Sequence, residues 1–249
     1  MDVRSIANLT AWYDASQITG LSDGDPVTNW PDVSGNSRDV VQATAARQPT
    51  YRTNVTAGRP VVRFDGSNDI LVTAVAVNNA QPNTYAVVVS SDFPTPGSGN
   101  AQGIVHNHNA GAGGENSLFL RSDNADYGVY GGALGLIDVV ASTAGFHVVL
   151  ASFNGTSSIL SVDGVEFTGN AGTLEMGGIA LGGRADSMSQ FLDGDIAEAV
   201  VYNSVPSVAE RGWLYRYLGR KYGVALAAKA GTPGHLDAVD IIDRPTLVS

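Results

Sequence analysis

Short apolar runs separated by glycine-containing turns dominate the chain from about residue 9 to residue 202. Residues 61–64 and 70–73 flank a polar turn, and residues 85–89 are nearly all apolar, as expected of a strand buried on both faces. Helical periods do not alternate with these runs, which argues against β-α-β units. The pattern therefore predicts an all-β domain with many antiparallel strands.

Two hairpins are predicted in the middle of the chain. Asn154-Gly155 separates the apolar runs 146–153 and 159–162, and Asp163-Gly164 follows directly. Both dipeptides tolerate positive φ, which the tight turns of antiparallel hairpins require.

One amphipathic helix is predicted after these strands. Ser207 and Glu210 have the spacing of a capping box, and Gly223 stands where a left-handed residue would end the helix. Its apolar stripe consists of Leu214, Tyr217, Leu218 and Tyr222. We expect this helix to lie across an edge or an end of a sandwich.

The last residues differ in character from the rest. Residues 225–249 contain glycine and proline around an apolar centre that includes Val239, Ile241 and Ile242. We interpret residues 1–224 as one domain and residues 225–249 as an extended tail, with these three side chains as assembly contacts. Packing of the tail on its own body is the alternative.

Composition excludes several classes of function. The chain of 249 residues has a formal net charge of −10, and no Lys/Arg cluster suited to phosphates is evident in the sequence. Nucleic-acid binding is therefore not expected, and neither is membrane insertion, since no apolar segment is long enough to span. Cysteine is absent, so stability must come from packing. The N-terminal residues lack the features of a secretion signal.

Several segments resemble the laminin-G-like branch of the concanavalin A-like lectin/glucanase superfamily. They are residues 62–71, residues 154–165 and residues 191–203, in that order along the chain. Residues 9–16 and 30–36 resemble modules of bacteriophage minor tail and other virion surface proteins. The resemblance implies a jelly-roll sandwich of two antiparallel sheets with one C-terminal helix and an extended tail.

For function, the resemblance implies a non-catalytic virion protein of a bacteriophage tail or capsid surface, made in the host cytoplasm without a signal peptide. It would assemble with other virion proteins or with copies of itself, and bind a cell-surface glycan. A free carbohydrate-binding module is the first alternative, and a glycoside hydrolase is the second. This fold hosts many functions, so the site must decide between them.

Three carboxylates are candidates for catalysis under the hydrolase alternative. Retaining glucanases of the superfamily place acids along one strand, and Asp193, Asp195 and Glu198 have a similar spacing. An aspartate at the first position shortens the would-be nucleophile, and Gly194 fits a bend near a turn better than a packed catalytic strand. We therefore expect no enzymatic activity.

No cofactor is expected, although two patterns are compatible with a metal ion. His106 and His108 share one strand face, and Glu115 follows nearby, as a divalent metal site would need.

Calcium is the other alternative, because relatives in the superfamily carry rim sites made of oxygen ligands. The candidate ligands are Asp23, Asp25, Asp65, Asn68 and Asp69. Ordinary turn chemistry explains the same residues.

A glycan site needs an exposed aromatic platform with polar neighbours. The candidates are Trp30, Asn124, Asp126, Tyr127 and Tyr130. Aromatic side chains in strands also serve as core residues, which is the competing interpretation for each of them.

Overall fold

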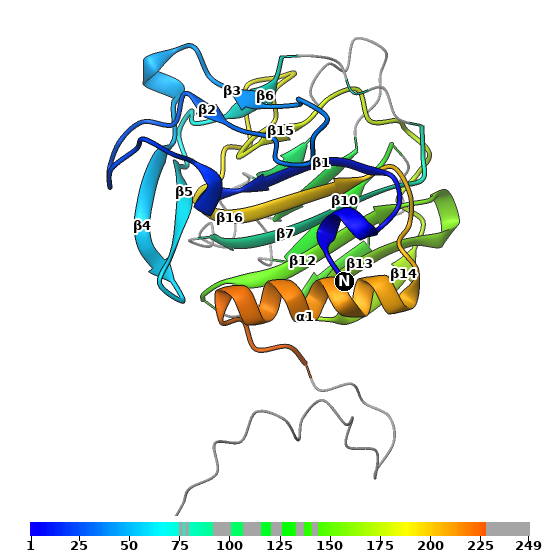
Figure 1. The fold of residues 1–249 in the computed structure, drawn as a ribbon. Coiled ribbons are helices and arrows are strands. Elements are labelled where there is room, and N and C mark those ends of the chain that lie inside the picture. The colour runs from blue at the N-terminus through cyan, green and yellow to red at the C-terminus, as the bar shows by residue number, and fades with distance from the viewer. Residues whose placement is uncertain are drawn as a thin grey trace, which may run out of the picture.

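A computed structural model describes residues 1–74, 77, 80–91, 101–106, 116–120, 126–132, 137–140 (backbone only) and 144–227. Two antiparallel sheets of eight strands each are stacked as a sandwich, and one α-helix lies against the outside of one sheet (Figure 1). The predicted all-β sandwich with a single C-terminal helix is confirmed.

Sheet A carries the helix. Seven of its strands follow the order β14-β13-β12-β7-β16-β5-β4, and β1 also pairs with β16. Its strands are β1 (Leu9–Asp14), β4 (Thr50–Thr56), β5 (Arg59–Asp65), β7 (Asn83–Ser91), β12 (His147–Phe153), β13 (Ser158–Val162), β14 (Val165–Gly169) and β16 (Asp193–Tyr202).

Sheet B forms the other layer, in the order β11-β10-β9-β8-β15-β6-β3-β2. Its strands are β2 (Asn29–Trp30), β3 (Val40–Val41), β6 (Leu71–Thr73), β8 (Gln102–His106), β9 (Ser117–Leu120), β10 (Asp126–Tyr130), β11 (Ile137–Val140) and β15 (Ala180–Leu181). The short 3₁₀ turn η1 (Val3–Ser5) precedes β1, and η2 (Ala15–Gln17), η3 (Ala45–Arg47) and η4 (Gly155–Ser157) lie in connections between strands.

Strand β16 is the centre of sheet A. Strand β7 pairs with one of its edges, while β5 and β1 share the other edge in succession. Residues 193–196 pair with β5, and residues 198–202 pair with β1. A bulge between Ile196 and Glu198 separates the two halves.

Gly194 lies inside β16, opposite Phe64 of β5 and Ser91 of β7. The expectation that this glycine marks a bend near a turn is therefore wrong. A Cβ at this position would collide with the backbone of Ser90 and Ser91, so only glycine allows β7 to approach so closely.

Two hydrophobic cores follow from the alternation of side chains along the strands. In β7, Tyr85 and Val87 point into the core between the sheets, whereas Ala86 and Val88 point to the outer face of sheet A. The helix α1 (Val208–Tyr222) covers that outer face with Leu214 and other apolar side chains. The domain thus has three layers over this part of its surface.

The boundaries of α1 agree with the sequence prediction. The Ser207 hydroxyl accepts from the Glu210 amide, the Glu210 carboxylate accepts from the Ser207 amide, and Gly223 is left-handed with φ of 70°. Its predicted position is wrong, because the helix lies across the face of sheet A rather than along an edge or end. The reason is the apolar outer face of β7 and β12, which needs a cover.

The second predicted hairpin turn is confirmed, since Asp163 and Gly164 both have positive φ between β13 and β14. The first is longer than expected. Asn154 has a negative φ of −154° with ψ of 51°, and η4 continues the connection before β13 begins. A two-residue Asn-Gly turn therefore does not form.

The first residues of the predicted tail contact the body. Leu226 packs against the core beneath α1, and the Ala227 amide donates to the Asp163 carbonyl at 2.9 Å. Val239, Ile241 and Ile242 lie outside the described residues, and the division at residue 224 stays a prediction. Among the residues that the structure covers, no helix has the length and apolar character needed to cross a membrane.

Candidate functional site

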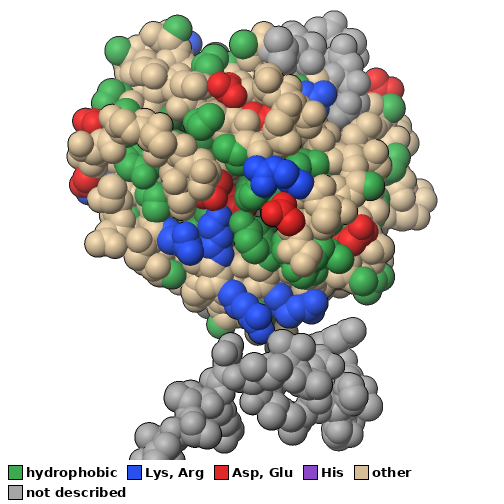
Figure 2. All heavy atoms as spheres, viewed as in Figure 1, with side chains coloured by type: hydrophobic (Ala, Val, Ile, Leu, Met, Phe, Trp, Pro, Cys, Tyr) green, Lys and Arg blue, Asp and Glu red, His purple; other side chains and the backbone are tan. Residues whose placement is uncertain are grey.

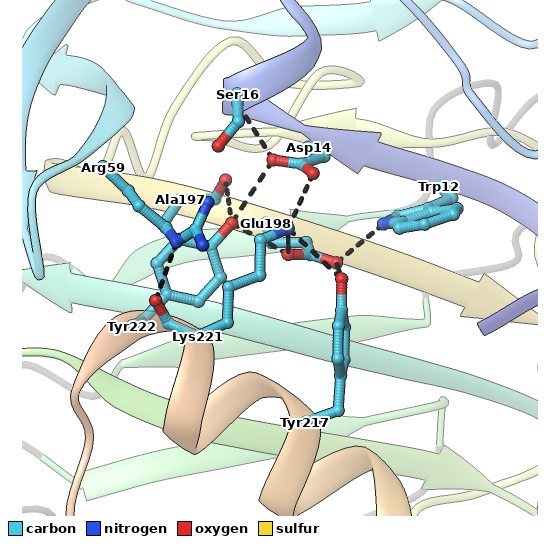
Figure 3. Close-up of polar contacts among 9 residues, drawn as sticks. All are labelled: Trp12, Asp14, Ser16, Arg59, Ala197, Glu198, Tyr217, Lys221 and Tyr222. Carbon is cyan, nitrogen blue, oxygen red and sulfur yellow. Dashed lines mark hydrogen bonds and ion pairs between the residues drawn. The ribbon is translucent and has the colours of Figure 1, made fainter. Parts of the chain in front are cut away.

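A buried polar cluster connects α1 to sheet A and contains one of the catalytic candidates (Figure 3). The carboxylate of Glu198 accepts from Trp12 Nε1 at 2.7 Å and from the Tyr222 hydroxyl at 2.8 Å. Lys221 Nζ donates to Glu198 and to Asp14, at 2.6 Å each. Strands β1 and β16 thus supply two carboxylates, and the last turn of α1 supplies the cation between them.

The environment of Glu198 is closed. Its side chain is fully buried, and this burial raises its pKa above the ordinary value, while the charge of Lys221 opposes the shift. Tyr217 on α1 adds a hydrogen bond at 3.1 Å. A saccharide has no access to this carboxylate, so the cluster holds the helix on the sheet rather than performing chemistry.

The other two catalytic candidates do not assemble with Glu198 into an open site. Asp195 is buried and accepts two hydrogen bonds from Arg63, at 2.7 and 2.8 Å, across the β5–β16 pair. Asp193 is exposed at the start of β16. Glycosidase acids must both reach the scissile bond, whereas here Asp195 is held by Arg63 and Glu198 is sealed beneath α1.

The calcium candidates form separate turns. Asp23 accepts from the Thr53 amide at 2.8 Å and faces Arg52, while Asp25 accepts from the Ser22 amide at 2.7 Å.

Asp65 accepts from the amides of Ser67 and Asn68, and Asp69 accepts from the Asp65 amide at 3.1 Å. Turn hydrogen bonds explain these residues, and within the described ranges no group of three His, Asp or Glu side chains could hold a metal ion. His108 and Glu115 lie outside those ranges. The predicted metal site of His106, His108 and Glu115 therefore stays a prediction.

Asp69 gives the protein a testable pH dependence. Burial, and then the nearby charge of Asp65, raise its pKa from 3.8 to about 6. The folded state binds a proton more tightly than the unfolded chain, so stability should fall as the pH rises through this window. We expect Asp69→Asn to reduce the change in the free energy of unfolding between pH 4 and pH 7, measured by urea denaturation, by about 1 kcal/mol after solvent screening. Equal slopes for the two proteins would contradict this assignment.

Of the glycan candidates, Trp30 and Tyr127 lie in the core between the sheets, with exposures of 0% and 1%. They cannot present a ring face to a sugar, because both point toward sheet A. Asp126 is buried as well, and Asn124 lies outside the described residues. Tyr130 alone of the described candidates is half-buried at a surface hollow.

That hollow is a pocket of about 280 Å³ on the outer face of sheet B, away from α1. Its lining residues are Ala101, His106, Ser117, Phe119, Tyr130, Arg184 and Gln190. His106, Ser117 and Tyr130 are register partners across β8, β9 and β10, so their side chains form one row. Phe119 follows two residues after Ser117 on the same face.

Arg184 closes one side of this pocket. It donates to both carboxylate oxygens of Asp186, at 2.7 and 2.9 Å, and this fork fixes the guanidinium plane. The pocket therefore combines two aromatic rings with a small set of oriented polar groups. The sequence predicts metal binding for His106 and glycan binding for Tyr130, and the sheet register places both in one pocket.

A second hollow of about 630 Å³ runs beside α1, which we call the α1 groove. Its lining residues are Met1, Arg59, Trp213, Arg216, Tyr217, Arg220 and Lys221. Figure 2 shows Lys and Arg side chains gathered on this face of the molecule. Arg216, Arg220 and Lys221 are neighbours in the sequence, whereas Arg59 on β5 joins them only through the fold.

Comparisons with known proteins identify the fold. No protein-family model matches the chain, and no similar protein was found among curated sequences. A sialidase of Trypanosoma rangeli in complex with sialic acid is similar in structure at 16% identity and a TM-score of 0.60, over 89% of this chain and 34% of the sialidase. This chain thus spans about a third of that protein.

Domain 4 of AbnA, an extracellular GH43 arabinanase from Geobacillus stearothermophilus, is similar over nearly its whole length. The match covers 84% of this chain and 99% of that domain, which is in complex with arabinotriose, at 14% identity and a TM-score of 0.59. These likenesses fit a two-sheet sandwich of the concanavalin A-like kind.

The expectation of a bacteriophage virion protein is wrong. The similar structures belong to proteins named as glycosidases, and they do not point to a tail or capsid. The short N-terminal segments that resembled tail modules are β1 and the connection around β2, which are ordinary parts of the sandwich. A resemblance in such segments indicates a shared fold, but it does not indicate that the protein belongs to a virion.

Proposed function

We propose that this chain is a non-catalytic carbohydrate-binding domain that holds a saccharide in the pocket on the outer face of sheet B. The observation that carries the proposal is the row of His106, Ser117 and Tyr130, with Phe119 beside it. Aromatic rings stack on the apolar faces of sugars, and the half-buried rings of Tyr130 and Phe119 are the exposed part of this row. His106 and Ser117 are only 1% and 4% exposed, so they shape the pocket more than they present polar atoms to a ligand.

The size and the rigidity of the pocket favour a small ligand. A volume of about 280 Å³ suits one or two sugar rings. Its walls stand on three hydrogen-bonded strands, and Arg184 is fixed by Asp186, so little ordering is needed when a ligand binds. The arabinotriose complex of the similar arabinanase domain supports a saccharide as the ligand class.

The chemistry of the lining residues supports binding without turnover. Most glycosidases need an acid and a second carboxylate about 5–9 Å apart around the scissile bond, and sialidases, which use a tyrosine nucleophile, are an exception. The described lining residues of the pocket include no Asp or Glu. The carboxylates of β16 belong to the other sheet, and Glu198 is sealed beneath α1.

The test is a binding measurement with Tyr130→Ala. Loss of the ring should weaken binding of the best saccharide about tenfold or more, because a stacking surface of about 1.5 kcal/mol is removed. Arabinotriose and a panel of neutral oligosaccharides would first be screened on the whole chain, and the best would be titrated by calorimetry.

Phe167→Ala is the matched control, since Phe167 is an aromatic residue on β14 of sheet A that is 41% exposed. It should leave the affinity unchanged. Absence of binding across the panel, or equal affinity of Tyr130→Ala and the unchanged protein, would refute the proposal.

A further inference from the structure

The lining of the α1 groove is positively charged, although the chain as a whole is acidic. The whole protein has 24 acidic and 14 basic residues, yet the described lining of this groove contains no Asp or Glu. Three guanidinium groups and one ammonium group line it, from Arg59, Arg216, Arg220 and Lys221. Positive charge is therefore concentrated at one place on an acidic protein.

The cations differ in how far they are already neutralised. Lys221 is shared between Glu198 and Asp14, and it contributes little net charge. Arg216 and Arg220 are exposed, one helical turn apart, and have no hydrogen-bond or ion-pair partner among the described residues. Arg220 lies in the last turn of α1, where the helix dipole favours a cation, whereas Arg216 lies one turn earlier and repels it by a few tenths of a kcal/mol, roughly.

Arg59 approaches the same groove from β5. Its Nε donates to the Lys221 carbonyl at 2.9 Å, which anchors the side chain at the end of α1 and leaves its terminal NH₂ groups for another partner. Its guanidinium is therefore fixed without an acid. A fixed planar donor is suited to a carboxylate, which accepts two parallel hydrogen bonds.

An aromatic surface accompanies the arginines. Trp213 stacks on Tyr217, with ring centroids 5.1 Å apart and an angle of 5° between the planes. Both rings are half-buried and line the groove. A further hollow of about 330 Å³, beside the α1 groove, adjoins Arg216 and Arg220 on the side of Gly223 and Leu226. Room for an extended ligand thus exists on both sides of the two arginines.

We propose that the α1 groove is a second saccharide site, which takes a chain bearing carboxylates of the hexuronate class. Trp213, held in place by its stacking on Tyr217, would contact the apolar face of a sugar ring, while Arg216, Arg220 and Arg59 bind carboxylates. A polyglutamate peptide has the charge but no sugar ring whose apolar C–H face could stack on Trp213. The groove is also formed by a helix and the sheet face beneath it, so it offers no free strand edge to an extended peptide.

This site is independent of the proposed function. The α1 groove lies over sheet A, and the pocket with Tyr130 lies on the outer face of sheet B. A ligand of either site can therefore be tested with the other one intact.

The test uses the whole chain and oligogalacturonate of defined length, titrated by calorimetry at two salt concentrations. Binding is expected, weaker at high salt, and reduced at least thirtyfold in Arg216→Gln/Arg220→Gln. The matched control is Arg47→Gln/Arg52→Gln, which removes the same charge from other parts of the surface and should keep the affinity within twofold. Tyr130→Ala should also bind oligogalacturonate normally.

Three further arms decide the ligand class. A neutral oligogalactoside of equal length, a polyglutamate peptide and inorganic phosphate should each bind at least tenfold more weakly than oligogalacturonate. Trp213→Phe should remove the change in tryptophan fluorescence that oligogalacturonate produces. No binding, an unchanged affinity of the double arginine variant, or equal affinity for polyglutamate would overturn the proposal. Thermal melts would confirm that the exposed substitutions leave the fold intact.

Discussion

Replacement of Lys221 by methionine is expected to lower the free energy of unfolding by about 3–5 kcal/mol. The methionine keeps most of the aliphatic stem and removes the ammonium group that lies 2.6 Å from both Glu198 and Asp14. Two nearly inaccessible carboxylates would then face one another without a cation, and either a charge is left uncompensated or a proton must be taken up. Urea denaturation at pH 7 measures the loss.

The neighbouring Arg220 provides the control for this substitution. It stands one residue earlier on the same helix, is exposed, and has no partner in the described part of the chain. Arg220→Met should change stability by less than about 0.5 kcal/mol. Adding Glu198→Gln to Lys221→Met should recover part of the loss, because one negative charge is removed. Comparable effects of the two methionine variants would show that Lys221 carries no special role.

Gly194→Ala is expected to cost about 3 kcal/mol or more, although it adds a single methyl group. The new Cβ would collide with the backbone of Ser90 and Ser91. A change of side-chain rotamer cannot relieve such a clash, so the strands themselves would have to move. Because β7 and β16 are the central pair of sheet A, a shift between them would disturb both cores. The midpoint of thermal unfolding is the measurement.

Gly212→Ala is the matched control and should act in the opposite direction. This glycine lies in α1, where the nearest atom to a new Cβ is an Arg216 nitrogen at 3.5 Å, an ordinary contact. Alanine favours the helix by up to about 1 kcal/mol over glycine. The two substitutions make the same chemical change, so a similar effect of both would mean that close strand approach does not explain Gly194.

Local chemistry made much of the fold predictable. The capping box of α1 depends on Ser207 and Glu210 alone, and the Asp163-Gly164 turn depends on two adjacent residues that accept positive φ. Neither needs information from elsewhere in the chain. The placement of α1 was predicted wrongly, because the apolar residues that receive it come from strands spread over much of the sequence.

The candidate sites were harder to predict for the same reason. Trp30 and Tyr127 have the composition of a glycan platform, but the alternation of the strands turns them into the core. His106, Ser117 and Tyr130 come together only through the register of three strands. Spacing along one strand grouped Asp193, Asp195 and Glu198, although a bulge and the helix give them different surroundings.

The shared edge of β16 has a consequence for the order of folding. Leu9 pairs with Tyr202, so the partner of β1 lies nearly two hundred positions later in the chain. Chains dominated by such distant pairings fold slowly, since the entropy of closing the loop is lost before the contacts form. During synthesis, β1 must leave the ribosome long before β16 does. Until β16 has been synthesised and pairs with β1, the apolar residues of β1 lack their native partners.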